Sequence, residues 1–230
     1  MTQTTAPSRH SNWFVLVAAL FVTCLVVSNI IAVKVIDVAG YILPAAIIIF
    51  PVSYILGDIL TEVYGYGRAR QVIWLGFLCN VVAVVAIAAG GLLPAAGFWG
   101  EQEAYDAILG ATPRILAASF IAYLIGELVN AWVLARLKVA MEGRHLWVRT
   151  IGSTLVGQIL DSAVFITIAF AGIMPVEIMV GAVITQWLVK SAYEALATPL
   201  TYAAVGFLKR ADDVDVYDRD LHFRPFTISE

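Results

Sequence analysis

Two apolar stretches, IGSTLVGQILDSAVFITIAFAGI (151–173) and IMVGAVITQWLVKSAYEALATPLTYAAVGFL (178–208), each carry a charged residue away from their ends, Asp161 in the first and Lys190 in the second. A helix of about 20 apolar residues spans the hydrocarbon core of a bilayer, which is about 30 Å thick. A charge at mid-depth costs roughly 3 kcal/mol or more unless it is paired or hydrated. We therefore expect two membrane-spanning helices whose charged residues serve a function.

The composition of the whole chain indicates a polytopic membrane protein, because 61% of its 230 residues are hydrophobic and 13% are charged. The mean hydropathy is +0.87. We predict an all-α integral membrane protein that forms a single transmembrane domain over residues 1–230. Its six predicted transmembrane helices lie near residues 13–33, 41–63, 71–93, 114–135, 151–173 and 178–208. Residues 209–230 are predicted to form a solvated cytoplasmic tail.

The basic residues of the loops predict the orientation, because Lys and Arg are enriched in cytoplasmic loops. Most of the 14 Lys and Arg residues fall in the N-terminal segment, in the loops after the second and fourth spans, and in the tail. The opposite loops contain Lys34 and Arg114, together with the acidic residues Glu101, Glu103 and Asp106. We therefore expect a multi-pass protein of the cell (inner) membrane with both termini in the cytoplasm.

Two polar stripes follow the last two predicted spans. On the fifth span the stripe occupies an arc of roughly 100° and consists of Thr154, Gly157, Gln158 and Asp161. On the sixth span the stripe has i, i+4, i+8 spacing and consists of Gln186, Lys190 and Glu194, with Tyr193 on the same side. These faces predict a water-accessible cavity for a small polar solute, with Gly157 opening space between the helices. The alternative is a helix contact in which Lys190 pairs with Asp161 or Glu194.

The first and fourth predicted spans add polar residues that could complete the cavity. Glu127 and Asn130 lie three residues apart near mid-depth, and Ser28 and Asn29 lie in the outer half of the first span. The carboxyl group of Glu127 either contributes to the cavity or stays protonated in an apolar setting, because desolvation disfavours the charged form. A neutral acid at this depth could also carry a proton.

A possible latch lies near the cytoplasmic end of the second predicted span, where Pro51 and Gly57 predict a kink. Two acidic residues share one face there and two arginines follow a glycine turn. We expect these charges to pair as a structural or gating latch rather than to contact substrate. The predicted latch consists of Asp58, Glu62, Arg68 and Arg70.

Two other classes of protein compete with a transporter. An intramembrane enzyme is disfavoured because His10, His145 and His222 lie outside the predicted spans, which removes a membrane-embedded Ser–His dyad and a histidine-ligated metal site. A pair of acids, Asp58 with Asp161, stays open as an enzyme site. A membrane subunit that serves only in assembly is the second alternative. We expect no catalytic residue, no metal, no cofactor and no nucleic-acid partner.

Short strings in five of the predicted spans resemble one known family. They are Ser28-Asn29, Phe50-Pro51 with Asp58 and Tyr64-Gly65, Ala118-Ser119-Phe120-Ile121-Ala122-Tyr123 with Gly126, Ser153-Thr154-Leu155 with Gly157 and Asp161, and Lys190. In their order and spacing the chain resembles the queuosine precursor transporters. These are similar in fold to the membrane-embedded S-components of vitamin-uptake systems.

The resemblance implies import of 7-deazaguanine bases, such as queuine or its cyano- or aminomethyl-bearing precursors, for salvage into modified tRNA. A deazaguanine edge presents N–H donors beside a carbonyl acceptor. Asp161 or Glu194 would accept from the donors. Gln158 or Asn29 would read the edge, and Lys190 would donate to the carbonyl or pair with a carboxylate.

An aromatic ring such as Tyr193, Trp187 or Phe120 would stack on the base, although packing is the more frequent role of any single ring. At Gln158 and Glu127 the chain departs from amides of some relatives, so the choice among deazaguanines stays open. The partners expected are the small-molecule substrate and the lipid bilayer, and a homodimer is compatible with the chain.

The resemblance leaves the energy source open. S-components work with an ATP-driven module and dock through small residues that repeat four apart on the first span. Here Ala18 and Ala19 are followed four places on by Val22 and Thr23, so that stripe is absent. We expect transport without an ATPase module, by proton coupling or facilitated diffusion. An S-component of an ATP-driven complex is the alternative.

Overall fold

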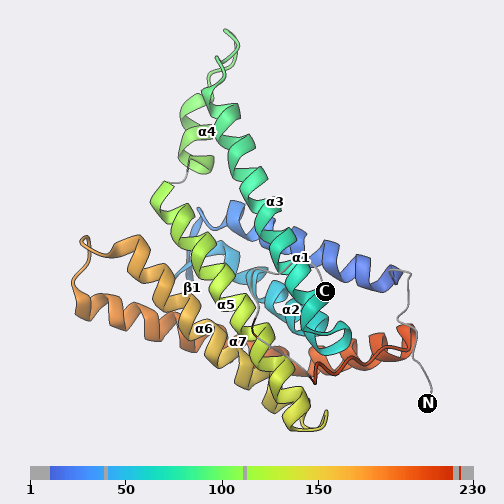
Figure 1. The fold of residues 1–230 in the computed structure, drawn as a ribbon. Coiled ribbons are helices and arrows are strands. Elements are labelled where there is room, and N and C mark those ends of the chain that lie inside the picture. The colour runs from blue at the N-terminus through green and yellow to red at the C-terminus, as the bar shows by residue number, and fades with distance from the viewer. Residues whose placement is uncertain (1–10, 39–40, 111–112, 220–222, 224–230) are drawn as a thin grey trace.

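The computed structural model of the chain describes residues 11–38, 41–110, 113–219 and 223. Within this part the predicted all-α class is confirmed, with one short β-hairpin added. Figure 1 shows long helices that cross one another, with α4 and the end of α3 projecting beyond the rest. In chain order the elements are α1 (Asn12–Ile31), β1 (Val35–Val38), β2 (Tyr41–Pro44), the 3-10 helix η1 (Ala45–Ile48), α2 (Phe50–Tyr64), α3 (Tyr66–Leu92), α4 (Gln102–Leu109), α5 (Pro113–Ala140), α6 (Leu146–Phe170) and α7 (Val176–Asp212).

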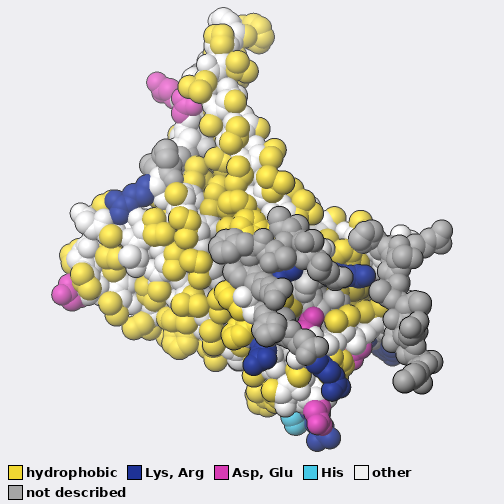
Figure 2. Space-filling view, in the orientation of Figure 1, with side chains coloured by type: hydrophobic (Ala, Val, Ile, Leu, Met, Phe, Trp, Pro, Cys, Tyr) yellow, Lys and Arg dark blue, Asp and Glu magenta, His cyan; other side chains and the backbone are white. Residues whose placement is uncertain are grey.

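Four segments of the described chain are long and apolar enough to cross a membrane, and they correspond to the first, third, fourth and fifth predicted spans. They are Asn12–Ile31, Tyr66–Leu92, Gln102–Ala140 and Leu146–Phe170. The helix α2 has 15 residues, and α7 has 37 residues with several charges among them. Six crossings therefore stay a prediction. Figure 2 shows hydrophobic side chains over much of the visible surface, as a lipid-facing protein requires.

The second predicted span begins later than expected. Residues 41–44 form β2, which pairs antiparallel with β1 in the register Val35↔Pro44, and α2 begins only at Phe50. Pro51 lies in the first turn of α2, where a missing N–H leaves no helical hydrogen bond unmade. Pro51 therefore starts a helix, which corrects the predicted kink.

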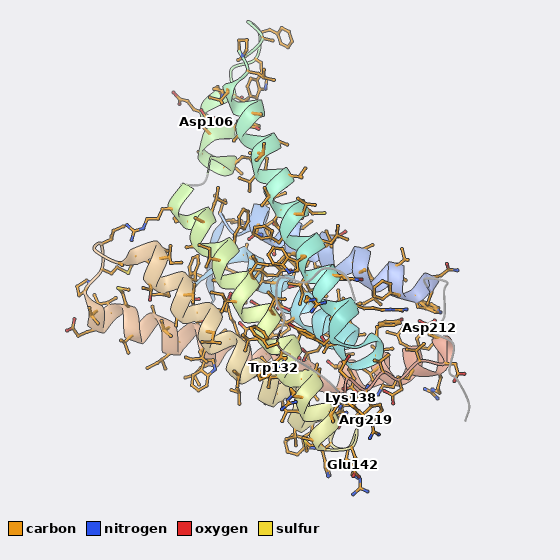
Figure 3. The ribbon with its side chains drawn as sticks, viewed as in Figure 1. Asp106, Trp132, Lys138, Glu142, Asp212 and Arg219 are labelled. Atoms are coloured by element: carbon orange, nitrogen blue, oxygen red, sulfur yellow. The ribbon has the colours of Figure 1, made fainter. Side chains whose placement is uncertain are left out.

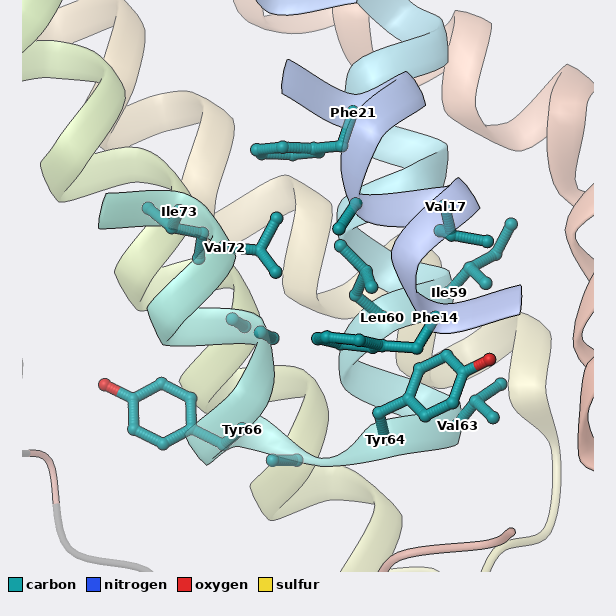
Figure 4. Close-up of a cluster of buried hydrophobic side chains, with 14 of the residues drawn as sticks. Phe14, Val17, Phe21, Ile59, Leu60, Val63, Tyr64, Tyr66, Val72 and Ile73 are labelled. Carbon is teal, nitrogen blue, oxygen red and sulfur yellow. The ribbon is translucent and has the colours of Figure 1, made fainter. Parts of the chain in front are cut away.

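The apolar core joins α1, α2 and α3 with side chains of α5, α6 and α7, and Figure 4 shows the part formed by α1, α2 and α3. A tight turn holds α2 and α3 together, because Gly65 has φ of 87°, a conformation that glycine adopts at little cost. A Cβ at Gly65 would also lie 2.7 Å from Cγ1 of Val216. The labelled core side chains are Phe14, Val17, Phe21, Ile59, Leu60, Val63, Tyr64, Tyr66, Val72 and Ile73.

The helices α5 and α6 cross in close contact at two glycines. A Cβ added to Gly126 would lie 2.8 Å from Cβ of Asp161, and one added to Gly157 would lie 2.7 Å from Cβ of Asn130. The space beside Gly157 is thus filled by α5, so its predicted role of opening a cavity is wrong. The glycines instead let the two backbones approach, as small residues do between membrane helices.

The described part of the predicted tail is packed against the helices. The last helix extends to Asp212, whose carboxylate accepts a 2.6 Å hydrogen bond from the hydroxyl of Tyr64. Asp218 accepts a 2.9 Å hydrogen bond from the backbone N–H of Tyr66. Residues 209–219 thus alternate exposed and half-buried positions, and long-range partners anchor the half-buried ones through contacts that the local sequence does not show. A solvated cytoplasmic tail stays a prediction. Residues 220–222 and 224–230 and the predictions on His10 and His222 lie outside the described residues.

Candidate functional site

An ion pair joins α6 to α7 inside the helical assembly. Lys190 Nζ donates to Oδ2 of Asp161, and the two side chains are 22% and 10% exposed. The same ammonium group lies 5.5 Å from the ring centroid of Phe50 and 6.0 Å from that of Tyr54, within the range of a cation–π attraction. The pairing of Lys190 with Asp161 is one of the two that the helix-contact alternative predicts.

Acidic groups of α2 and α5 lie close to this pair. Asn130 Nδ2 donates to Oδ1 of the buried Asp58 at 2.7 Å. Glu127 lies beside Gly57, where an added Cβ would be 3.0 Å from Glu127 Oε2. Because Gly57 has no side chain, a buried carboxyl group fits against α2. Glu127 is near enough to interact electrostatically with Asp161, Glu194 and Lys190.

Several buried oxygen atoms in this region lack a hydrogen-bond partner among the described residues. They are Asp58 Oδ2, Glu127 Oε2, Asn130 Oδ1, Gln158 Oε1 and Glu194 Oε1. A buried polar atom without a partner costs about 1 to 3 kcal/mol, so most such atoms in proteins are paired. All five are acceptors. We call the surrounding residues the mid-bundle cluster, which consists of Asp58, Glu127, Asn130, Gln158, Asp161, Lys190 and Glu194.

Sequence reasoning missed some neighbours of the cluster. Ser162 and Ser191 are buried, and their hydroxyl oxygens have no hydrogen-bond partner among the described residues. Phe50 and Tyr54, whose rings meet edge to face with centroids 5.0 Å apart, supply the aromatic faces beside Lys190. Each serine directly follows a charged residue of the cluster in sequence. One residue turns a helix by about 100°, so the polar stripes drawn from helical rotation did not include the serines.

Asn29 lies in a different place from the one predicted. Its Nδ2 donates to Oδ1 of Asn80 on α3 at 2.6 Å, and both residues line a cavity of about 340 Å³ among α1, α3, α4 and the start of α5. Tyr105 and Asp106 of α4 also line this cavity. Figure 3 shows that Asp106 lies toward one end of the molecule, whereas Lys138 and Glu142 lie toward the other. A lone Asn within the apolar third span was the sequence signal for Asn80.

The predicted stacking rings have mixed surroundings. The indole Nε1 of Trp187 donates to the backbone carbonyl of Leu155 at 2.9 Å, which ties α7 to α6. Phe120 meets Phe77 with ring centroids 5.8 Å apart. Tyr193 is partly buried on α7, between Lys190 and Glu194 in sequence. Trp187 and Phe120 thus have packing roles, and stacking on a base stays a prediction.

A second buried charge cluster surrounds Glu62, and we call it the Glu62 cluster. Arg149 Nη1 contacts Glu62 Oε2 at 2.5 Å, and Lys209 Nζ contacts Oε1 at 2.7 Å. Lys138 Nζ lies 3.7 Å from Oε1 and donates to the Glu62 backbone carbonyl at 2.5 Å. Asp215 joins the cluster through contacts of 2.5 Å to Lys138 and 2.9 Å to Lys209. Four helices and the tail therefore meet at one acid.

The cluster gives Glu62 partners different from those predicted. In the described part of the chain, residues distant in sequence supply the cations that contact Glu62, in place of the predicted Arg68 and Arg70. The guanidinium carbon of Arg68 instead lies 5.5 Å from the ring centroid of Phe14, and that of Arg70 lies 5.5 Å from the ring centroid of Tyr66. Both arginines sit over aromatic faces, a placement that the loop sequence does not indicate.

Asp215 is the acid of this cluster that lies beyond the last helix. Burial by itself raises the pKa of the Asp215 carboxyl. The hydrogen bonds from Lys138 and Lys209, with their positive charges, outweigh that effect and hold the pKa below its ordinary value. The carboxylate is therefore stabilised as the charged form.

The chain is similar in sequence to known transporters. Residues 44–204 match the family of putative vitamin uptake transporters. The chain is similar to the probable queuosine precursor transporter of Bacillus subtilis (strain 168), with 28% identity over 180 residues that cover 78% of this chain and 79% of the relative. It is also similar to the queuosine precursor transporter of Escherichia coli (strain K12), with 27% identity over 124 residues that cover 53% of this chain and 52% of the relative.

A third relative, the probable queuosine precursor transporter of Haemophilus influenzae (strain ATCC 51907 / DSM 11121 / KW20 / Rd), is 28% identical over 123 residues that cover 53% of this chain and 49% of the relative. The matched part of the chain thus spans about half the length of the second and third relatives. No solved structure matches the chain.

Proposed function

This chain belongs to the putative vitamin uptake transporter family, and we propose on that premise that it carries queuosine precursors, 7-deazaguanine bases, across a membrane. The family and the relatives confirm the resemblance drawn from the sequence and favour a transporter over an enzyme. The three similar proteins carry the substrate class in their names.

The mid-bundle cluster is the proposed binding site. The observation that carries this proposal is the set of five buried acceptor oxygens without a partner among the described residues, next to one ion pair. A deazaguanine edge offers N–H donors for such acceptors. Gln158 and Asn130 would accept from the ring, and Lys190 would turn from Asp161 to the ring carbonyl. Phe50 and Tyr54 offer faces on which a flat heterocycle stacks.

The cavity beside Asn29 is the proposed approach to this site. Asn80 lies one helical turn from Gly76, and a Cβ at Gly76 would be 3.0 Å from the hydroxyl of Tyr123. Tyr123 lies one turn from Glu127 on α5. These residues are packed against one another, so under this proposal Tyr123 must move away from Gly76 for a substrate to pass from Asn29 to the cluster.

Transport without an ATPase module is the proposed mode. Ser28, which has small–small spacing with Ala32 on the first span, is fully buried and donates to the carbonyl of Leu25 at 2.8 Å. Its small side chain therefore faces the protein interior and not a docking partner. We also propose the inner membrane as the location, cytoplasmic termini, the bilayer as surroundings and a homodimer as a compatible assembly.

Uptake in cells that cannot make 7-deazaguanines tests the proposal. Cells expressing the chain alone should accumulate labelled base. At equal protein level Asp161→Asn or Lys190→Ala should lower the uptake about tenfold or more, because each removes one partner of the ion pair inside the helical assembly. The control is Glu177→Gln, an exposed acid in the first turn of α7. Absence of uptake by the unaltered chain would contradict the transport proposal. Uptake that required an added ATPase module would contradict the independent mode.

A further inference from the structure

The mid-bundle cluster contains more acids than bases. Four carboxyl groups, those of Asp58, Glu127, Asp161 and Glu194, meet one ammonium group, that of Lys190. Lys190 already donates to Asp161. Three carboxyl groups therefore have no ion pair among the described residues.

Three buried or partly buried cations, and the exposed Arg114, have partners outside the cluster. Lys138, Arg149 and Lys209 surround Glu62. Arg114 donates to the backbone carbonyls of Ile168 and Ala171, at 2.6 Å each, near the end of α6. The cluster thus draws no second cation from these residues.

The three carboxyl groups without an ion pair converge from three helices. Asp58 of α2 interacts electrostatically with both Glu194 of α7 and Glu127 of α5, and each is at most 2% exposed. Each also keeps one oxygen without a hydrogen-bond partner in the part of the chain that the structure describes. The amide oxygens of Asn130 and Gln158 are also buried, and they too accept no hydrogen bond from the described residues.

A group of this kind has a defined chemical complement. A buried carboxyl group either keeps its proton or meets a cation, because an isolated carboxylate is costly in a low dielectric. A primary ammonium group carries one positive charge and three N–H donors and has no acceptor. Three N–H donors match the three free carboxyl oxygens, whereas a nitrile brings neither charge nor donor.

We infer that the mid-bundle cluster selects, among 7-deazaguanine bases, those that carry an amine substituent over those that carry a nitrile, and that Asp58, Glu127 and Glu194 are the residues that hold the amine. The inference rests on the proposed function and adds its substrate preference. The amides of Asn130 and Gln158 then serve the ring, which both kinds of base share.

Binding of two bases to the purified full-length protein tests the inference. The aminomethyl base and the cyano base share one ring, so their ratio of dissociation constants isolates the substituent. We expect the aminomethyl base to bind about tenfold or more tightly, because charge-assisted hydrogen bonds are roughly twice as strong as neutral ones. Glu194→Gln should weaken the aminomethyl base about tenfold and leave the cyano base within about threefold. Glu177→Gln, the same chemical change at an exposed position of α7, should change neither.

The outcomes separate the two proposals. Equal affinity of the unaltered chain for both bases would overturn the inference and leave the transport proposal standing. Equal loss of both bases in Glu194→Gln and in Glu127→Gln would also overturn it, because the acids would then serve the ring or the fold. Failure to bind either base would overturn the transport proposal itself. If Glu194→Gln does not fold, the inference is tested by the ratio of the two dissociation constants in the unaltered chain and in Glu127→Gln.

Discussion

Asp58 and Glu62 lie one turn apart on α2 and have contrasting surroundings. Both carboxylate oxygens of Glu62 contact cations from other helices. Asp58 accepts one hydrogen bond from the neutral amide of Asn130, and its second oxygen has no partner among the described residues. Both acids are 1% exposed. A buried acid therefore occurs both in the structural Glu62 cluster and in the candidate site. The two differ in the partners that the carboxylate oxygens have.

The comparison suggests a division of labour within one assembly. The Glu62 cluster ties α2, α5, α6, α7 and the tail together, and each of its charges has an opposite charge in contact. The mid-bundle cluster has buried acceptors without a partner among the described residues, and under our proposal a ligand satisfies them. Substitutions in the first should therefore act on stability, and substitutions in the second should act on transport.

The largest effect is expected from Glu62→Ala. The change leaves Arg149, Lys138 and Lys209 close together with fewer counter-charges, and removal of one partner from a buried ion pair costs about 3 to 5 kcal/mol. Thermal unfolding of the purified protein should show a large loss of stability, and the amount of protein in the membrane should fall. A variant as stable as the unaltered chain would remove the contrast between the clusters.

The next largest effect is expected from Gly157→Ala. The added Cβ would lie 2.7 Å from Cβ of Asn130 and 2.9 Å from the Gly126 carbonyl oxygen, so α5 and α6 must separate. Overpacking of this kind costs about 1 to 3 kcal/mol. The melting temperature measures it, and Gly181→Ala is the control because a Cβ there meets nothing within 4 Å. Equal behaviour of the two variants would contradict the close crossing.

Glu127→Gln is expected to change stability less than the two previous variants and to lower transport instead. The amide keeps the shape of the side chain and removes a carboxyl group that has no ion pair among the described residues. The free energy of unfolding should therefore stay within about 1 kcal/mol of the unaltered value or rise. Uptake of labelled aminomethyl base should fall in the same variant. A loss of stability like that of Glu62→Ala would show that Glu127 is structural.

The smallest effect is expected from Asp215→Asn, which removes the tail carboxylate from Lys138 and Lys209. The folded pKa of Asp215 is lowered, so its stabilising contribution is present above about pH 4, the ordinary carboxyl range, and is lost as the pH falls through the folded pKa. Because the side chain is 41% exposed, the contribution at neutral pH is about 0.5 kcal/mol or less. Melting temperatures of the two proteins should differ at pH 7 and converge below about pH 4. A difference that persisted at low pH would contradict the ionic role.

Much of the fold could be predicted from the sequence because apolar length is a local property. The helices α1, α3, α5 and α6 fall where their apolar runs predict them. The start of α2 could not be predicted, because residues 41–48 are apolar and form β2 and a 3-10 helix instead. The docked tail could not be predicted either, since its contacts with Tyr64 and Tyr66 join residues about 150 positions apart.

The site divides in the same way. Helical rotation placed Gln158 and Asp161 on one face and Lys190 and Glu194 on another, and the structure buries Gln158, Asp161 and Glu194. Rotation did not indicate that Gly157 packs against Asn130, or that Asn29 lies with Asn80 by a separate cavity. Each of these depends on which helix lies next to which.

The sequence by itself determined that this chain is built of apolar helices with ionisable groups set among them, because hydropathy and helical period are read from neighbouring residues. Only the tertiary structure decided which charges meet. Glu62 is joined to Arg149 and Lys209, which lie 87 and 147 positions away, whereas one oxygen of Asp58 has no partner in the part of the chain that the structure describes. The reason is that a rotation about one helix axis fixes the direction of a side chain, whereas the partner in that direction belongs to another helix whose position the local sequence does not specify.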